Sequence, residues 1–405
     1  MLHDAALAIL RERLSPVIGQ EEIALADATG RIAAAEIAAP RDIPAFDNSA
    51  VDGYAFNASA YPSGSSPLRV VARIAAGNRG GIAIAAGETA RIFTGAPMPP
   101  GADTVAMQED CQVQPDGGVL IPAGLKPGAN RRRAGEDVKA GAVIVAPGRI
   151  LRPQDIAQIA SVGRARVTVF RRLRIGLVSS GNELRRPGEP LGENGVYDAN
   201  YFLLRALLNP LPVALEDLGI LPDEAAQTRE RISGAAGKCD VLLSSGGASL
   251  GEEDHLSNAI AALGSRHVWQ LAIKPGRPMA FGQIGATACF GLPGNPVAAF
   301  VCFLLYVRPA IVRLAGGDWF EPHRFPLPAA FSFSGKKVGR REFWRGELVR
   351  GADGAVAVRK FARDGSGLIS GLRAADGLIE VGEEVIDVRE GQPVDFIPFA
   401  EFGIG

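Results

Sequence analysis

Cysteine and histidine are scarce in this chain of 405 residues, which contains four of each. The cysteines show no metal-ligand spacing and lie mostly among apolar neighbours, so we expect buried thiols in a reducing compartment and no disulfides. The same scarcity leaves no plausible zinc cluster, and no Ser-His-Asp order supports a nucleophilic triad. A net charge of -1 gives no bulk attraction to nucleic acid. Zinc enzymes, triad hydrolases and nucleic-acid-binding proteins are therefore disfavoured.

A signal-peptide core and an uninterrupted membrane-spanning run are also lacking. The first residues, which include His3, Asp4 and Arg11, follow a helical pattern without the apolar core of a signal peptide. The most apolar segment, residues 297–314, is interrupted by two arginines and a proline and follows a Gly-Asn-Pro turn. We interpret it as a buried helix of a globular core. A cytoplasmic protein with no membrane partner is expected.

Glycine and proline, in contrast, are abundant. The 50 glycines and 28 prolines predict many turns, short strands and several small modules. Strands and helices alternate from residue 174 to about 317, which is typical of a doubly wound, mostly parallel sheet with helices on both faces. Short runs between residues 68 and 121 favour a small antiparallel β module or barrel. Further short runs after Trp319, the last at 384–388, predict a C-terminal β domain.

The order of these patterns predicts a multidomain α/β protein. A helix starting at Pro153 is expected to pack on the N-terminal helix, which makes the β module an insertion. The predicted domains are an elongated, discontinuous α+β domain (1–43 and 136–172), the inserted β module (44–135), the central α/β domain (173–317) and the C-terminal β domain (318–405).

A strand, a glycine loop and a helix follow one another over residues 241–264. Such a loop lets a ligand approach the backbone closely, and the helix start behind it favours an anion, so a phosphate-bearing ligand is expected. Alternatively, the glycines only turn the chain and Asp254 only caps the helix. A second strand and loop at 174–184 follow the same plan. Because ligands sit beyond the carboxyl ends of parallel strands, Glu183 and Asp254 should lie close together.

Other polar loops fall into a basic group and an acidic group. The basic residues suit a multiply charged oxyanion, because Arg forks and Lys charges make strong hydrogen bonds; they are Lys274, Arg277 and, less directly, Arg345 and 131–133. The acids suit Mg²⁺, which is held by one or two carboxylates plus ligand phosphates; they are Asp52, Glu183, Asp223 and Asp254. Phosphoryl-type chemistry with Mg²⁺ therefore leads among the reactions considered.

Plainer interpretations of several of these segments stay open. Asp223 could only cap a helix, and Asn295 with Pro296 could only start one. Residues 341–346 could be an ordinary strand edge, and 364–367 a hairpin turn.

Seven segments together resemble the molybdopterin molybdenumtransferase family, which includes bacterial MoeA and the gephyrin E domain. They occur in the family's order and span nearly the whole chain: 46–55 (FDNSAVDGYA), 91–97 (RIFTGAP), 132–137 (RRAGED), 180–184 (SGNEL), 245–254 (SGGASLGEED), 274–278 (KPGRP) and 291–297 (GLPGNPV). Each motif alone is weak, but the combination is specific.

The resemblance implies the last step of molybdenum cofactor synthesis. Molybdate would be inserted into the dithiolene of adenylylated molybdopterin, with Mg²⁺-dependent loss of AMP. It also implies an elongated homodimer of four-domain subunits, in which the sheet domain of one subunit faces the β module of the other. The adenylyltransferase that acts before it and apo-molybdoenzymes that act after it are further partners to consider.

Carried onto matching positions, the resemblance implies a role for each site residue. Catalytic roles would fall to Asp52, Glu183, Asp254 and Lys274. Glu183 and Asp254, with Asp223 nearby, would bind the metal and the pterin nucleotide. Substrate contacts would come from Thr94, Asp137, Ser245, Gly246, Gly247, Ser249, Pro293 and Asn295, with Asp52, Thr94 and Asp137 completing the cleft from the partner subunit. Molybdate would be caged by Lys274, Arg277, Arg345 and Ser366.

Two positions depart from the family's pattern. Members often have Lys where this chain has Arg277, which keeps the charge and alters its geometry. They also often have Ser where this chain has Ala298, which removes a hydroxyl.

Two other functions remain as alternatives. An adenylyltransferase would share the glycine loop and consume ATP, but it would not need the flanking modules. A non-catalytic dimeric scaffold would tolerate loss of the charges in the cleft. Molybdate and tungstate, two tetrahedral oxyanions of nearly equal size, both suit the basic group, and either water or a molybdate oxygen would serve to attack the pyrophosphate.

Overall fold

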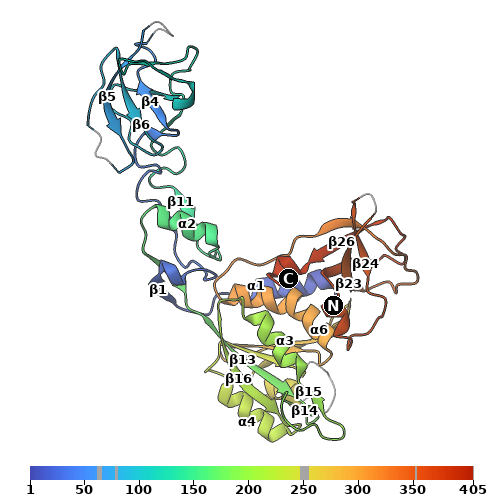
Figure 1. Ribbon diagram of the computed structural model, residues 1–405. Coiled ribbons are helices and arrows are strands. Elements are labelled where there is room, and N and C mark those ends of the chain that lie inside the picture. Colours follow the sequence, from blue (N-terminus) through green and yellow to red (C-terminus); the bar gives the residue numbers. More distant parts are fainter. Residues whose placement is uncertain (62–65, 78–80, 247–254, 352–353, 405) are drawn as a thin grey trace. The chain divides into compact units, whose positions relative to one another are not determined.

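The computed structural model describes residues 1–61, 66–77, 81–246, 255–351 and 354–404 (Figure 1). The chain divides into two compact units. The first comprises Met1–Ala35, Pro147–Leu151 and Thr168–Gly405, and the second comprises Glu36–Ala146 and Arg152–Val167. The four domain boundaries expected from the sequence stay a prediction.

A six-stranded sheet forms the centre of the first unit. Its spatial order is β16 (Val213–Leu221), β13 (Leu173–Ser180), β17 (Val241–Ser245), β21 (Thr287–Leu292), β20 (Pro278–Ile284) and β18 (Ser265–Gln270). The first four strands are mutually parallel, and β20 and β18 are antiparallel to their neighbours. Strand β17 is buried at every position. A strand that is covered by helices on both faces has no solvent-facing side, which explains why β17 begins with a continuous apolar run. The prediction of a mostly parallel sheet is confirmed.

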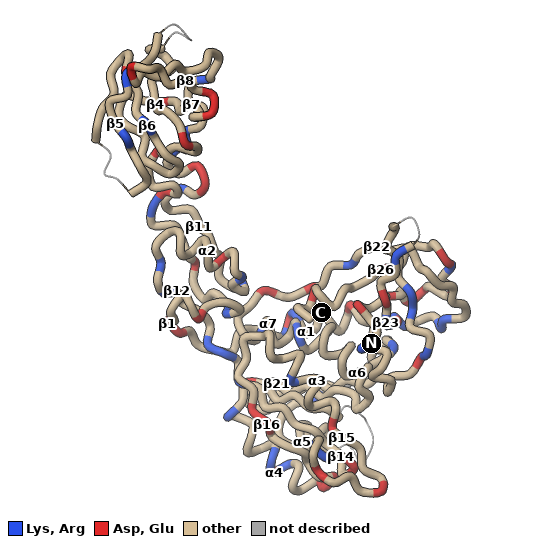
Figure 2. Tube along the Cα trace, viewed as in Figure 1, with Lys and Arg blue, Asp and Glu red and all other residues tan. Residues whose placement is uncertain are grey.

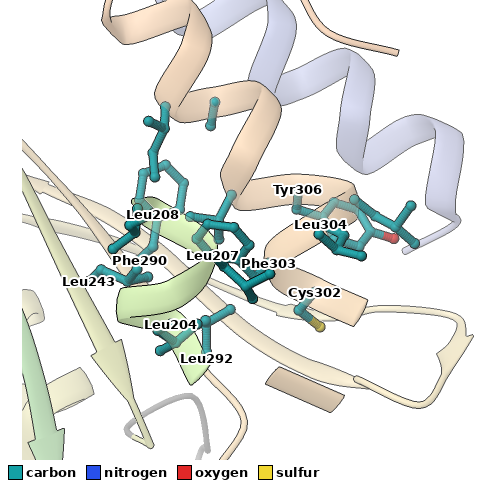
Figure 3. Close-up of a cluster of buried hydrophobic side chains, with 14 of the residues drawn as sticks. Leu204, Leu207, Leu208, Leu243, Phe290, Leu292, Cys302, Phe303, Leu304 and Tyr306 are labelled. Atoms are coloured by element: carbon teal, nitrogen blue, oxygen red, sulfur yellow. The ribbon is translucent and has the colours of Figure 1, made fainter. Parts of the chain in front are cut away.

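Helices cover both faces of this sheet. On one face lie α3 (Ala199–Leu208) and a long helix formed by α6 (Pro296–Cys302), a π-helical turn η3 (Phe303–Val307) and α7 (Arg308–Leu314). On the other face lie α4 (Ala225–Ala235) and α5 (His255–Leu263). Alternation along β13 divides its side chains between the two cores, because successive residues of a strand point to opposite faces. Figure 3 shows side chains of α3, the sheet and the long helix meeting in the larger core.

The long helix is long and apolar enough to cross a membrane by length and composition, but 94% of its most apolar window is buried inside the protein. Phe303, Leu304 and Tyr306 are among its fully buried side chains (Figure 3). Pro309 follows the π-helical turn at the start of α7, where its missing N–H costs least. The interpretation of this segment as a buried core helix is confirmed.

The N-terminal helix α1 (His3–Arg13) packs into the same core through Ala6 and Leu10, against α7. The expectation that it packs on the helix starting at Pro153 is wrong. That helix, α2 (Pro153–Ser161), belongs to the second unit, and Val162 just beyond it packs with Ala39 and Val138. The amphipathic pattern of α1 identified its buried face but not its partner.

A second six-stranded sheet forms the C-terminal part of the first unit. Its spatial order is β19 (Ile273–Lys274), β23 (Arg341–Arg350), β25 (Gly377–Val381), β26 (Pro393–Pro398) and β22 (Phe325–Pro328), with β24 (Val356–Lys360) also paired to β23. The strand predicted at 384–388 is wrong, because there only Val388 makes an isolated bridge, to Phe333. The sequence pattern missed β26, which begins and ends with proline.

Short elements complete the first unit. Strand β1 (Gln20–Ala24) pairs with β12 (Arg166–Phe170), of which the part from Thr168 onward belongs to this unit, and β14 (Leu184–Arg185) pairs with β15 (Val196–Tyr197). The remaining helical turns are η1 (Leu25–Asp27), α8 (Ser370–Arg373) and η4 (Phe399–Phe402).

The second unit contains a four-stranded sheet in the order β5 (Arg69–Ile74), β6 (Glu88–Ile92), β4 (Gly53–Phe56) and β7 (Thr104–Met107). Strand β4 is antiparallel to both neighbours, but β5 and β6 are parallel, so the expected antiparallel module is a mixed sheet. Three two-stranded pairs accompany it: β2 (Ile37–Ala38) with β11 (Val143–Val145), β3 (Asn48–Ser49) with β10 (Arg131–Arg132), and β8 (Gln112–Val113) with β9 (Val119–Leu120). The turn η2 (Gln108–Asp110) follows β7.

A buried histidine connects α1 to the long helix. His3 is fully buried, and its Nδ1 lies 2.6 Å from the hydroxyl oxygen of Tyr306. Burial, helped by the positive charge of Arg341, lowers the pKa of His3 to about 4. The folded protein therefore holds this imidazole neutral at pH values where an unfolded chain protonates it.

We expect this histidine to make stability depend on pH. Between pH 6.5 and about 4 the unfolded chain binds a proton that folded His3 does not, so the free energy of unfolding falls as the pH falls through this window, by up to about 3 kcal/mol. Thermal unfolding of wild type and His3→Gln at pH 4.5, 5.5 and 6.5 measures this. The variant should show a shallower loss of stability than the wild type. Equal slopes for His3→Gln and wild type would contradict the assignment.

Candidate active site

The carboxyl ends of the four parallel strands bring several predicted loops together at one edge of the central sheet. Asp223 accepts a hydrogen bond from the backbone N–H of Asn182 at 2.9 Å, and the Asn182 side chain accepts one from the Asp223 N–H at 3.2 Å. Further along the edge, the Gly246 N–H donates to the Leu292 carbonyl at 3.0 Å. The loops after β13 and β16 are thus joined to each other, and the start of the loop after β17 is joined to the last residue of β21.

The start of the glycine loop approaches the neighbouring strand closely. Gly246 has a φ of +87°, and a Cβ at this position would lie 3.3 Å from the Ser180 carbonyl oxygen. Ser245, the last residue of β17, is buried. Gly247, Ser249 and Asp254 lie outside the described residues. The expected proximity of Glu183 and Asp254 therefore stays a prediction.

The two described acids at this edge have different environments. Glu183 is exposed, and its carboxylate folds over Gly181, where a Cβ would collide with it. Asp223 does not cap its helix: α4 begins at Ala225 with Glu224 at the N-cap, and the Asp223 side chain instead holds the neighbouring loop. In the described part of the chain, no group of three or more His, Cys, Asp or Glu side chains is placed to hold a metal ion.

A cavity of about 420 Å³ lies where the central sheet domain meets the C-terminal sheet. It brings together six residues that were expected at the site from four separate segments: Lys274, Arg277, Pro293, Asn295, Arg345 and Ser366. Ala298, one of the two departures from the family's pattern, also lines it. The loop at 293–295, which contributes Pro293 and Asn295 to the lining, follows β21 directly and is held by the Asn200 side chain, which donates to the Gly294 carbonyl at 2.7 Å.

Pairing between β19 and β23 places Lys274 in this cavity, opposite Glu342. The Lys274 ammonium lies 3.5 Å from Glu342 Oε2 and 3.6 Å from Asp364 Oδ2. Glu342 is buried, and it also accepts hydrogen bonds from Arg340 Nε at 2.9 Å and from the Trp344 indole at 2.8 Å. A buried carboxylate needs such donors to offset the loss of water. With its position fixed in this way, Glu342 in turn holds the Lys274 ammonium in place.

The turn that carries Lys274 packs directly on α6. Gly276 has a φ of +105°, and a Cβ there would lie 2.5 Å from the Cys302 sulfur. Only glycine therefore fits this turn without displacing the helix. Arg277 is exposed at the cavity and has no ion-pair partner among the described residues.

Arg345 is buried and braces the loop that carries two other cavity residues. Its guanidinium donates to the Leu368 carbonyl at 3.0 Å and to the Arg363 carbonyl at 2.7 Å. Burial lowers the pKa of Arg345, while the negative charge of Asp364 opposes this. The Ser366 carbonyl accepts a hydrogen bond at 2.9 Å from the Val297 N–H in the first turn of α6. The loop is therefore held from both sides.

The plainer interpretations of this region are only partly correct. Pro296 is the first residue of α6 and Asn295 is its N-cap residue, but the Asn295 side chain makes no cap hydrogen bond and lines the cavity. Residues 341–346 lie in β23, which is paired on both sides and is not an edge. Residues 364–367 are not a hairpin turn, because the chain passes through α8 before β25.

Sequence reasoning missed one charged residue of the cavity, Lys360, and considered its partner Asp364 only as part of the 364–367 segment. Their side chains are 2.7 Å apart. Burial opposes ionisation of Asp364, but the hydrogen bond and charge of Lys360 hold the pKa of this carboxyl below its usual range. The spacing of four residues was the one available signal. It could not identify a pair, since the intervening segment is an irregular loop.

The second unit contains the other expected site residues. Asp52 accepts hydrogen bonds from the backbone N–H and the hydroxyl of Thr94, both at 2.8 Å, and these lower its pKa. Asp137 is exposed, and its N–H donates to the Ile43 carbonyl at 3.0 Å. Of the three consecutive arginines, Arg131 lies 3.4 Å from Asp47 and is already paired.

Comparisons with known proteins agree along the whole chain. Residues 1–163 match the MoeA N-terminal region (domain I and II), 176–313 match a probable molybdopterin binding domain, and 327–399 match the MoeA C-terminal region (domain IV).

Relatives of the full length support the same assignment. A molybdopterin molybdenumtransferase of Haemophilus influenzae is 37% identical over 98% of both chains, and molybdopterin molybdenumtransferase 2 of Mycobacterium tuberculosis is 31% identical over 96% of both. A molybdopterin biosynthesis moeA protein from Pyrococcus horikoshii has a TM-score of 0.84 at 28% identity, covering 98% of this chain and 99% of that one. The motifs, the domain matches and these relatives together show that the chain belongs to the molybdopterin molybdenumtransferase family.

Proposed function

We propose that this protein inserts molybdate into adenylylated molybdopterin and releases AMP, which forms the molybdenum cofactor. The observation that carries the proposal is the convergence of Lys274, Arg277, Arg345 and Ser366 on one cavity in a chain of this family. The loop that ends β21 borders this cavity, and β21 is hydrogen-bonded to the glycine loop. A ligand held by the glycine loop can thus extend toward the cavity.

The cavity suits a doubly negative oxyanion. Arg277 offers a guanidinium that has no ion-pair partner within the described part of the chain, Lys274 offers a partly exposed ammonium, and Ser366 offers a hydroxyl. Charge-assisted hydrogen bonds from such groups are stronger than neutral ones. Glu342 is held by Arg340 and contacts the Lys274 ammonium, so the ammonium keeps its position when a ligand binds in the cavity.

The residues at the sheet edge fit Mg²⁺. Glu183 is an exposed carboxylate, and Asp223 keeps one oxygen without a partner in the described part of the chain. Two carboxylates together with ligand phosphates are the usual set for this ion. Glu183, Asp223 and Asp254 would hold it, and the ion would neutralise charge on the pyrophosphate linkage as adenylate leaves.

Asp52, Thr94 and Asp137 are proposed to complete the site from the second subunit of a homodimer. The hydrogen bonds from Thr94 keep Asp52 ionised and oriented, which suits contact with a metal-bound or hydrogen-bonding ligand. We further propose that the protein acts in the cytoplasm, between the adenylyltransferase and apo-molybdoenzymes. Three free buried thiols fit a reducing compartment.

The first test concerns Lys274. Lys274→Ala removes an ammonium directed at the oxyanion, so molybdate-dependent AMP release should fall about 100-fold or more. AMP is measured from adenylylated molybdopterin with and without molybdate. Lys238→Ala, at an exposed lysine of the same unit just before β17, serves as the matched control and should release AMP normally. Unchanged release by Lys274→Ala would refute the site assignment, and ATP consumption by the wild type would favour an adenylyltransferase.

The second test concerns the shape of Arg345. Arg345→Lys keeps the charge but cannot donate to both loop carbonyls, so the loop with Ser366 should lose its position. The KM for molybdate should rise about tenfold or more. Arg359→Lys, on the neighbouring strand and paired with Glu347, is the control and should keep the wild-type KM. An unaltered KM in Arg345→Lys would show that the two hydrogen bonds from the Arg345 guanidinium to the loop carbonyls are not needed for molybdate binding.

The third test concerns the metal. Chelation should abolish AMP release, and added Mg²⁺ should restore it. Glu183→Gln should raise the Mg²⁺ concentration that gives half-maximal release by about tenfold, because it removes one charged ligand. The control Glu193→Gln, in the exposed loop nearby, should leave this concentration unchanged. Full activity after chelation would exclude the metal from the reaction.

A further inference from the structure

An internal carboxylate, that of Asp364, lies between two cations of the cavity. Asp364 Oδ2 lies 3.6 Å from the Lys274 ammonium, and Asp364 Oδ1 lies 2.7 Å from the Lys360 ammonium. One carboxylate therefore bridges two cations that line the same cavity. Figure 2 shows basic and acidic residues close together around β23, in the region that contributes this side of the cavity.

Lys360 depends on this anion. Its side chain is only 11% exposed, and its ammonium lies 5.3 Å from the centre of the Phe333 ring and 5.4 Å from that of Trp344. Aromatic faces stabilise a cation partly, but a desolvated ammonium still needs a negative partner. Lys360 does not reach bulk water easily, so an anion that displaced Asp364 would find a second positive charge already in place.

The two carboxylates next to Lys274 differ in how readily they can leave. Glu342 is buried and fixed by Arg340 and Trp344. The Asp364 side chain is 51% exposed and belongs to an irregular loop, and Gly365 after it has a φ of +134°. The carboxylate of Asp364 can therefore move into water, whereas the buried carboxylate of Glu342 cannot leave its donors without a large desolvation cost.

We propose that Asp364 is an internal stand-in for the oxyanion, that molybdate enters by exchanging with it, and that Lys360 then becomes an additional oxyanion contact. This inference rests on the proposed function. It assigns a role to Lys360, which no motif singled out, and to Asp364, which the sequence analysis considered only as part of a turn. A carboxylate edge and one edge of a tetrahedral oxyanion both present two oxygens to two donors. A dianion attracts the two ammonium groups more strongly than the single carboxylate does, which drives the exchange.

The exchange explains how the cavity avoids an uncompensated cluster of charge when it is empty. Lys274, Arg277, Arg345 and Lys360 line it, and like charges at short range destabilise the fold. Asp364 is ionised at neutral pH, since Lys360 and Lys274 lower its pKa despite burial. The same carboxylate can return when the oxyanion has left.

Direct binding of molybdate, measured by titration calorimetry on the full chain, tests the proposal. Asp364→Asn removes the competing charge and keeps the side-chain shape, so molybdate should bind about threefold to tenfold more tightly than to wild type. Asp364→Ser should show the same gain. The control Asp395→Asn, at an exposed acid on β26 of the same sheet, should match wild type. A gain in affinity cannot come from damage to the fold.

Lys360→Gln tests the second half of the proposal. It should weaken molybdate binding about threefold or more in both the wild-type and the Asp364→Asn backgrounds, because it removes an oxyanion contact in each. Equal or weaker binding by Asp364→Asn and Asp364→Ser would overturn the stand-in role and leave the proposed function intact. No binding by wild type or any variant would overturn the oxyanion site itself, and the inference with it.

Discussion

The position of one ammonium group, that of Lys274, depends on the junction between two sheets. The two-residue strand β19 leaves the central domain and pairs with β23 of the C-terminal sheet, which sets Lys274 opposite Glu342. Glu342 is buried and neutralised by Arg340 and Lys274 together. Because unpaired charge is costly inside a protein, this network fixes the relation between the two sheets and the orientation of the lysine at once.

The apolar core packs against the same junction between the two sheets through helix α6. Helix α6 lies beneath the Lys274 turn, with the Cys302 sulfur in the space that a side chain at Gly276 would need. The first turn of α6 also holds the loop of Ser366 through the Val297 N–H. One buried helix therefore positions both the Lys274 turn and the loop of Ser366, which lie on two sides of the cavity. The helix is as apolar as a membrane span in composition because it packs inside the core on most of its surface.

The cavity combines rigid and replaceable charges. Arg345 is held by backbone carbonyls and Glu342 by two donors, so neither is free to move when a ligand enters. Asp364 and Arg277 are exposed and can reorganise. Groups that are already fixed stabilise a bound oxyanion without a cost of rearrangement. Exposed side chains that can move leave room for the oxyanion to enter.

The sequence by itself determined the family, the mostly parallel central sheet and the buried helix, because these depend on local periodicity and on motifs that single segments carry. It also predicted Lys274, Arg277, Arg345 and Ser366 as site residues, and the structure places all four around one cavity. Only the tertiary structure decided that α1 packs on α7 and that 341–346 is an interior part of a sheet. It alone brought Lys360 and Asp364 to Lys274, since strand pairing joins β19, β23 and β24 across long separations in sequence. Such pairing depends on the packing of the whole unit, which no local pattern encodes.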